Sequence, residues 1–159
     1  MTDLKAGFFK LLKFLGDNED QAELFEGDPQ SFTHLVTIAK SVDDERLVYG
    51  VVYEPDVADA HGDFADAGEI RDMCHGFGVH YALAKSDNGV EHFADLPREA
   101  VAVVESYIAP VDFTLGVQPV TKGSWVMGAK VFDDALWKGV KDGTFTGWSF
   151  EGEGYREAV

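Results

Sequence analysis

The stretch VAVVESYIA, residues 101–109, is the clearest strand of this chain. It is apolar and rich in β-branched residues on both faces, which is typical of a strand covered on both sides. Glu105 is the one charged residue inside it, and a carboxylate is costly to bury unless it is paired or hydrogen-bonded. Glu105 can therefore face solvent, pair with a lysine, or hold the ring of a histidine in one tautomer.

The segments around this strand also favour β-structure. Strand-like runs are expected at residues 32–39, 46–53, 90–93, 114–120 and 124–132. The first two predict a hairpin around Asp43–Asp44, and the last two predict a strand pair that turns at Lys122–Gly123. Helices are expected over residues 67–86 and 133–141. Without regular βαβ alternation, the pattern predicts an α+β fold, a mostly antiparallel β-barrel with flanking helices.

The first thirty residues differ from the rest in composition and in hydrophobic pattern. Residues 4–15 place leucine and phenylalanine at helical spacing and predict an amphipathic helix. Residues 16–30 are acidic and poor in aliphatic side chains, which indicates a linker. We therefore expect residues 1–30 to precede one compact domain at 31–159. The helix can pack on that domain or dock on a partner protein.

Composition excludes several kinds of protein. A net charge of −16 over 159 residues argues against binding to a nucleic-acid backbone, which requires basic patches. No segment is apolar over the roughly 18–20 residues that span a membrane, and no secretory signal is predicted. The single Cys74 excludes an internal disulfide or a multi-cysteine metal site, and a buried thiol is expected. We expect an intracellular protein.

The run TFTGWSF, residues 144–150, contains the candidate nucleophile Ser149. A hydroxyl between two aromatic residues, with Gly147 shortly before it, is typical of a side chain presented from a tight strand. Such a serine becomes nucleophilic when a histidine accepts its proton, and His92 is the candidate base. The chain has neither a Gly-x-Ser-x-Gly elbow nor a glycine-rich phosphate loop, which excludes the hydrolase folds built on them.

A polar loop offers an alternative site. Asp56, Asp59, His61 and Asp63 could bind a divalent cation, as in a metal-dependent hydrolase. The loop lacks the calcium-binding pattern of twelve residues, and a turn that caps the following helix explains it better. His75 and His80 are five residues apart and do not share a helix face as zinc ligands do. We therefore expect neither a metal nor a cofactor.

Several motifs taken together resemble a known family. They are RLVYGVVYEPD at 46–56, DAHGDF at 59–64, VESYIAP at 104–110, DF at 112–113, KGSWV at 122–126, Trp137, and TGWS at 146–149. In this order the chain resembles the XkdF-like serine proteases of tailed phages and prophages, which are relatives of prohead maturation proteases. The resemblance covers roughly residues 37–152.

The resemblance implies a fold and a mechanism. It implies a small β-barrel surrounded by helices, similar to the herpesvirus assemblins. Ser149 matches the serine of the family's Gly-aromatic-Ser motif, and His92 matches the histidine before the Val-Glu-Ser-Tyr strand. Glu105 matches an acidic position and is expected as a third member. If the alignment shifts, His80 is the alternative base.

The resemblance also implies partners and a place of action. The substrates are expected to be scaffold and major capsid protein segments, and the protease itself, with self-association possible. Cleavage would take place inside the assembling procapsid, in the cytoplasm of a bacterial or archaeal host. The alternative is a noncatalytic capsid-assembly or scaffold-associated protein that keeps the protease fold.

Overall fold

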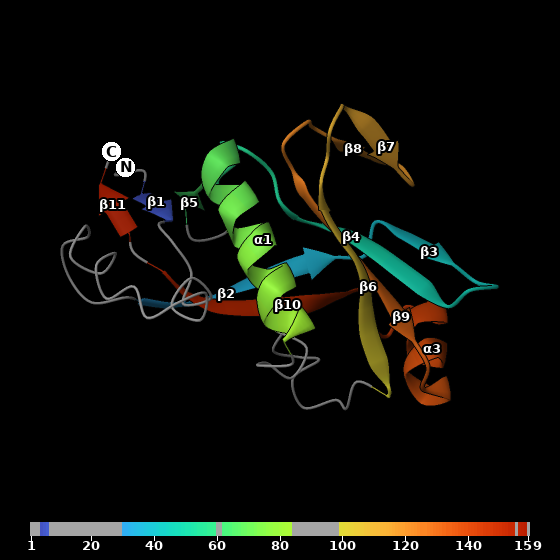
Figure 1. Cartoon of the computed structure of the whole chain (residues 1–159). Coiled ribbons are helices and arrows are strands. Elements are labelled where there is room, and N and C mark those ends of the chain that lie inside the picture. The colour runs from blue at the N-terminus through green and yellow to red at the C-terminus, as the bar shows by residue number, and fades with distance from the viewer. Residues whose placement is uncertain (1–3, 7–29, 60–61, 84–98, 155, 159) are drawn as a thin grey trace.

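The computed structural model describes residues 4–6, 30–59, 62–83, 99–154 and 156–158 (Figure 1). Its helices are α1 (Ala67–Ala82) and α3 (Asp134–Lys141). The strands of the first half are β1 (Leu4–Ala6), β2 (Gln30–Thr37), β3 (Lys40–Val42), β4 (Leu47–Tyr53) and β5 (Asp63–Phe64). Those of the second half are β6 (Val101–Ile108), β7 (Phe113–Leu115), β8 (Gln118–Val120), β9 (Trp125–Val131), β10 (Gly147–Gly154) and β11 (Arg156–Ala158).

The strands form four small sheets. The largest has the order β3-β4-β9-β6, and β2 pairs with β10 over eight residues in a second, antiparallel sheet. β7 pairs with β8, and β1 lies between β11 and β5. All pairs are antiparallel except β1 with β5. The fold is therefore α+β as predicted, and among the described residues none of the sheets closes into a barrel.

Two predicted strand pairings are wrong. The turn at Asp43–Asp44 joins β3 to β4, whereas β2 pairs with β10 from the other end of the chain. The partner of β8 is β7, because Gly116 adopts a φ of 64° and closes a tight turn between them. β9 instead fills the centre of the large sheet, where it pairs with both β4 and β6.

The predicted N-terminal helix is wrong where it can be compared. Leu4–Ala6 is the strand β1, whose backbone pairs with β11 on one side and β5 on the other (Figure 1). Pairing with segments distant in sequence overrides the local helical pattern. Residues 7–15 of the predicted helix lie outside the described residues, as does the predicted strand at 90–93. The division at residue 31 stays a prediction.

Both helices begin within one residue of their predicted starts, whereas α1 ends at Ala82 and not at the predicted residue 86. Asp66 caps α1: its carboxylate accepts a hydrogen bond from the Glu69 amide at 2.9 Å, and the Glu69 carboxylate accepts one from the Asp66 amide at 2.8 Å. This reciprocal capping box satisfies two amides that the first helical turn leaves without partners. At α3 the Asp133 carboxylate accepts from the Leu136 amide at 2.9 Å. Neither described helix combines the length and the apolar character that a bilayer crossing requires.

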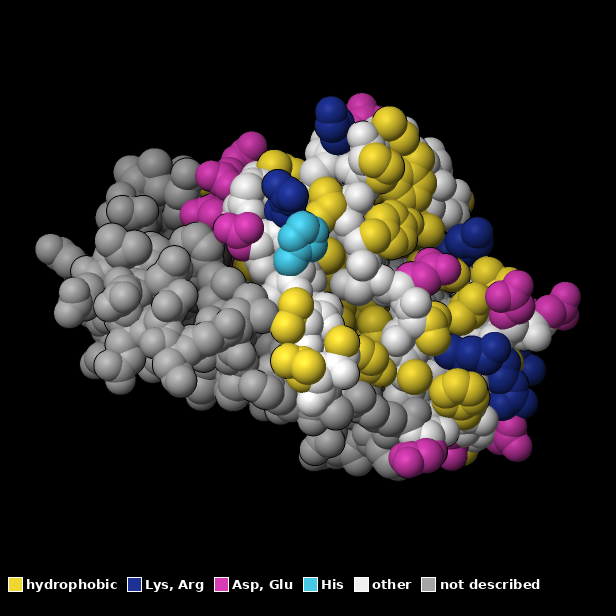
Figure 2. Space-filling model, viewed as in Figure 1, with side chains coloured by type: hydrophobic (Ala, Val, Ile, Leu, Met, Phe, Trp, Pro, Cys, Tyr) yellow, Lys and Arg dark blue, Asp and Glu magenta, His cyan; other side chains and the backbone are white. Residues whose placement is uncertain are grey.

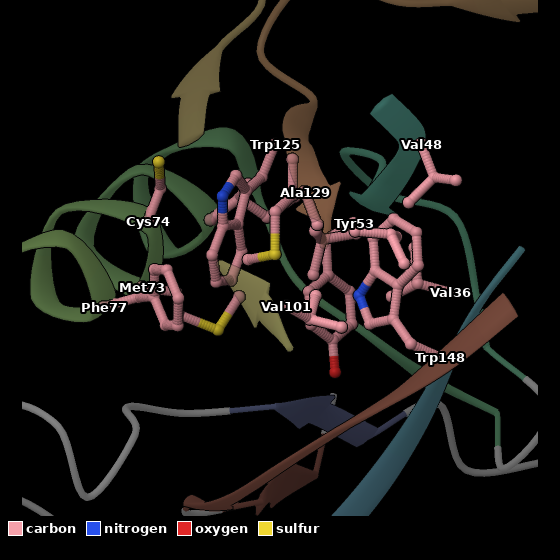
Figure 3. Packing of buried hydrophobic residues seen from close by; sticks show 14 of the residues in the cluster. Val36, Val48, Tyr53, Met73, Cys74, Phe77, Val101, Trp125, Ala129 and Trp148 are labelled. Atoms are coloured by element: carbon pink, nitrogen blue, oxygen red, sulfur yellow. The ribbon is translucent and has the colours of Figure 1, made fainter. Parts of the chain in front are cut away.

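The core lies between the large sheet, α1 and the β2–β10 pair (Figures 1 and 3). Trp125 and Met127 from β9 meet Met73 and Phe77 from α1, and the Phe77 and Trp125 rings lie 5.6 Å apart. Val36 and Trp148 close the other end of the core, at 0% and 2% exposed. The buried Trp148 side chain therefore anchors β10 to the core at this position.

A glycine in β4 permits this packing. A Cβ atom at Gly50 would lie 2.7 Å from the Thr37 carbonyl oxygen and 3.0 Å from the Trp148 ring. We expect Gly50→Ala to lower the free energy of unfolding by about 3 kcal/mol, because a backbone carbonyl cannot move aside cheaply. Chemical denaturation followed by tryptophan fluorescence measures this.

The matched control is Gly78→Ala in α1. A Cβ atom there meets nothing within 4 Å, so alanine should raise the free energy of unfolding by about 0.5–1 kcal/mol through its higher helix propensity. Equal effects of the two substitutions would contradict the close approach of β4 to Trp148.

Candidate active site

Ser149 lies in β10, so the predicted placement of this residue on a strand is confirmed. In the antiparallel register it stands directly opposite Leu35 of β2. Its neighbour Trp148 is buried in the core, whereas Leu35 is 68% exposed. Register and burial together place Ser149 on the face of the β2–β10 pair that turns away from the core, because neighbouring residues of a strand alternate between its two faces.

The histidines of the prediction are only partly described. His92 lies outside the described residues. His80 belongs to α1, and the structure describes its backbone position there. The distance between either imidazole and Ser149 therefore stays a prediction, and so does the choice between the two histidines as the base.

Glu105 lies in β6 at a β-bulge, where the register with β9 shifts between Val103 and Glu105. It is exposed, and it stands opposite Gly128 of β9, which in turn stands opposite Tyr49 of β4. A Cβ atom at Gly128 would lie 2.6 Å from Tyr49 Cε1 and 3.3 Å from Glu105 Cβ. The missing side chain therefore lets the Tyr49 ring lie across β9 toward Glu105.

The Tyr49 ring lies close to Glu105. Burial raises the pKa of Tyr49, and the negative charge of Glu105 and the ability of its carboxylate to accept the hydroxyl proton raise it further. Burial, followed by the charge of Glu105, also raises the pKa of Tyr107 on the same strand. Among the described residues, Glu105 therefore lies close to Tyr49 and Tyr107 on the outer face of the large sheet. Its role as the third catalytic member stays a prediction.

Ser106, the next residue of β6, faces the opposite way. Its hydroxyl accepts a hydrogen bond from Trp125 Nε1 at 2.9 Å and lies 3.7 Å from the Cys74 sulfur. Cys74 is 4% exposed, which confirms the expected buried thiol, and burial raises its pKa. The Val-Glu-Ser-Tyr motif therefore has residues on both faces of the sheet: Ser106 contacts the core side chains Trp125 and Cys74, whereas on the other face Glu105 is exposed and Tyr107 packs against a second, smaller hydrophobic cluster.

The acidic loop before α1 forms a turn. Asp59 accepts a hydrogen bond from the Asp63 amide through its carboxylate at 3.0 Å and from the Gly62 amide through its carbonyl oxygen at 3.0 Å. These contacts agree with the expected turn and capping segment. The described residues contain no cluster of three or more His, Cys, Asp or Glu side chains that could hold a metal. His61 of the same loop lies outside them.

A cavity of about 140 Å³ lies between β2, the end of β4 and this loop. His34 lines it and stacks on Tyr53 with ring centroids 4.3 Å apart. Burial raises the pKa of Tyr53, and the charges of Asp59 and Asp63 raise it further. Glu54 also lines the cavity and accepts a hydrogen bond from Thr121 at 2.6 Å.

His34 was not predicted as a site residue. It lies in a strand without an acidic neighbour in sequence, so only the fold brings it close to Tyr53. Its ring stacks on the core side of β2, whereas Leu35 faces outward. We therefore assign His34 to the packing between β2 and β4.

Comparison with known proteins agrees with the motifs. The model of a family described as "Putative phage serine protease XkdF" matches residues 34–157. The phage-like element PBSX protein XkdF of Bacillus subtilis (strain 168) is 39% identical over 156 residues, which cover 94% of this chain and 54% of that protein.

A second relative is the uncharacterized protein YqbD of the same organism. It is 39% identical over 127 residues, which cover 80% of this chain and 37% of that protein. The chain thus spans about half or less of the length of these curated relatives. No solved structure matches it. The family match covers all of β10, including Ser149, and the last four residues of β2, and the chain therefore belongs to the family described as "Putative phage serine protease XkdF".

Proposed function

We propose that this chain is a serine endopeptidase that cleaves scaffold and major capsid protein segments, and itself, during maturation of a phage procapsid. The observation that carries the proposal is the family match over residues 34–157, which includes the Gly-Trp-Ser motif on β10. The proposed place of action is the interior of the assembling procapsid in the host cytoplasm. The proposal includes the assemblin-like barrel that the family resemblance implies.

In the proposed reaction Ser149 Oγ attacks the carbonyl carbon of the scissile peptide. His92 accepts the hydroxyl proton, and backbone amides hold the negative charge that develops on the carbonyl oxygen. The protonated imidazole then gives its proton to the leaving amine, which breaks the C–N bond and leaves an acyl-enzyme. A water molecule, deprotonated by the same histidine, hydrolyses this ester and restores Ser149.

The backbone geometry supports this role for Ser149. β10 is held by eight register pairs with β2, and Trp148 is buried directly before the serine. A nucleophile on a strand with such an anchor keeps its position during the reaction, which favours attack because misplacement by about 1 Å can cost 100-fold in rate. The same strand presents Ser149 on the face that turns away from the core.

The test is processing of the expected substrates. The chain is co-expressed with the major capsid and scaffold proteins of a phage that encodes it, and the products are mapped by mass spectrometry. We expect shortened capsid and scaffold polypeptides with defined new termini. Full-length substrates in the presence of folded protein would contradict the proposal and favour the noncatalytic assembly protein.

Glu105 is tested by a charge change that keeps its size. If its carboxylate orients His92, Glu105→Gln should lower kcat by about 10⁴-fold, as loss of the charge does in other catalytic triads. Tyr49→Phe is the control, since it removes the neighbouring hydroxyl and keeps the carboxylate. We expect only Glu105→Gln to slow peptide cleavage, and unchanged kcat in both variants would exclude Glu105 from the catalytic group.

A further inference from the structure

Leu35 is a large apolar side chain held in solvent beside the proposed nucleophile. It is 68% exposed, whereas Val36, the next residue of β2, is fully buried. Single exposed apolar side chains are common on protein surfaces and need no special explanation. What distinguishes Leu35 is its position, directly opposite Ser149 in the β2–β10 register.

The register fixes how close the two residues are. Directly opposed residues of an antiparallel pair share a face, with Cβ atoms about 4.5–5.5 Å apart. A peptide whose carbonyl carbon reaches Ser149 therefore passes close to Leu35.

The other register positions of this face are small or polar. The neighbouring pairs are Gly147 with Thr37 and Glu151 with Thr33. Leu35 is thus the one large apolar residue among these three pairs. A Cβ atom at Gly147 would meet the Val36 backbone carbonyl, so glycine here permits the close approach of β10 to β2.

We propose that Leu35 forms the apolar wall of the subsite next to the scissile bond and selects an apolar substrate residue there. The inference rests on the proposed function of Ser149 and goes further, because it names the chemistry of the substrate position. Contact between apolar side chains removes both surfaces from water. Discrimination of about 10- to 200-fold is typical of an apolar pocket.

The experiment measures cleavage preference. The wild-type protein and variants are incubated with a peptide mixture of varied sequence, and the cut positions are read by mass spectrometry. Peptide pairs that differ only beside the scissile bond, with leucine or lysine there, then give ratios of kcat/KM. We expect the wild type to prefer leucine at one flanking position by at least about 10-fold.

Leu35→Glu should reverse this ratio in favour of lysine, because a carboxylate then replaces the apolar wall. Leu35→Ala is the milder variant and should lower the preference for leucine about tenfold while cleavage continues. Val117→Glu is the matched control: it puts the same charge in place of an apolar residue that is 93% exposed in the β7–β8 turn, and it should keep the wild-type ratio.

Two results would overturn the inference. Cleavage by Leu35→Ala with an unchanged leucine-to-lysine ratio removes Leu35 from the subsite and leaves Ser149 as the nucleophile. Absence of any cleavage by the folded wild-type protein instead removes the proposed function, and the subsite with it. The two failures are therefore distinguishable in one set of reactions.

Discussion

Replacing Ser149 by alanine is expected to lower the cleavage rate by about four to six orders of magnitude, because loss of a serine nucleophile abolishes the acyl-enzyme route. The substitution removes one oxygen atom and leaves the β2–β10 register and the buried Trp148 unchanged. Its thermal unfolding should therefore match that of the wild type. The measurement is the rate of peptide or capsid-protein cleavage by the purified variant.

Ser41→Ala is the control for this prediction. Ser41 lies in β3, is exposed, and carries the same functional group outside the proposed site. Its loss should leave the rate within about twofold, since surface substitutions away from special features change little. Full activity of a folded Ser149→Ala variant would mean that another residue attacks the substrate.

The second large effect is expected at the base. His92→Ala should lower kcat by about 10⁴- to 10⁶-fold, because the serine hydroxyl then has no acceptor for its proton. Ser149→Ala and His92→Ala together should be scarcely worse than either alone, because residues of one catalytic group act as a unit. The kcat/KM of the wild type should fall at acid pH, where the imidazole that accepts the serine proton is already protonated.

His80→Ala is the matched histidine control, and it decides between the two predicted bases. With His92 as the base, His80→Ala keeps its activity and its pH profile. The opposite pattern, an active His92→Ala and an inactive but folded His80→Ala, would identify His80 in α1 as the catalytic base. A hydrolytic activity that survives both substitutions would exclude both histidines.

The local elements of this chain could be predicted because they depend on neighbouring residues. The apolar runs at residues 101–109 and 46–53 predict β6 and β4, and the patterns at residues 67–86 and 133–141 predict α1 and α3. Ser149 could be placed on a strand for the same reason. Its flanking aromatics follow the two-residue period of β-structure.

The pairing of the strands could not be predicted in the same way. β2 and β10 pair although more than a hundred residues separate them, and nothing near Leu35 in sequence indicates Ser149 as its partner. β1 pairs with β5 and β11, which are distant in sequence. The helical spacing of residues 4–15 therefore predicts the wrong structure for residues 4–6.

The environment of Glu105 could also not be predicted from the sequence. Its contact with Tyr49 passes over Gly128 on the strand between them, so three distant segments must come together before the pair exists. The isolated charge in an apolar strand left three interpretations open, in which Glu105 faces solvent, pairs with a lysine or holds a histidine, and Glu105 is exposed in the structure. Only the folded sheet shows that its partner among the described residues is a tyrosine.

The most direct test of the central claim is covalent labelling of the nucleophile. A fluorophosphonate reacts with an activated serine hydroxyl, and peptide mass spectrometry locates the adduct. We predict one adduct, on the peptide that contains Ser149, with its formation abolished in Ser149→Ala and strongly slowed in His92→Ala. An adduct on a different serine, or an actively cleaving protein whose Ser149 stays unlabelled, would contradict Ser149 as the nucleophile.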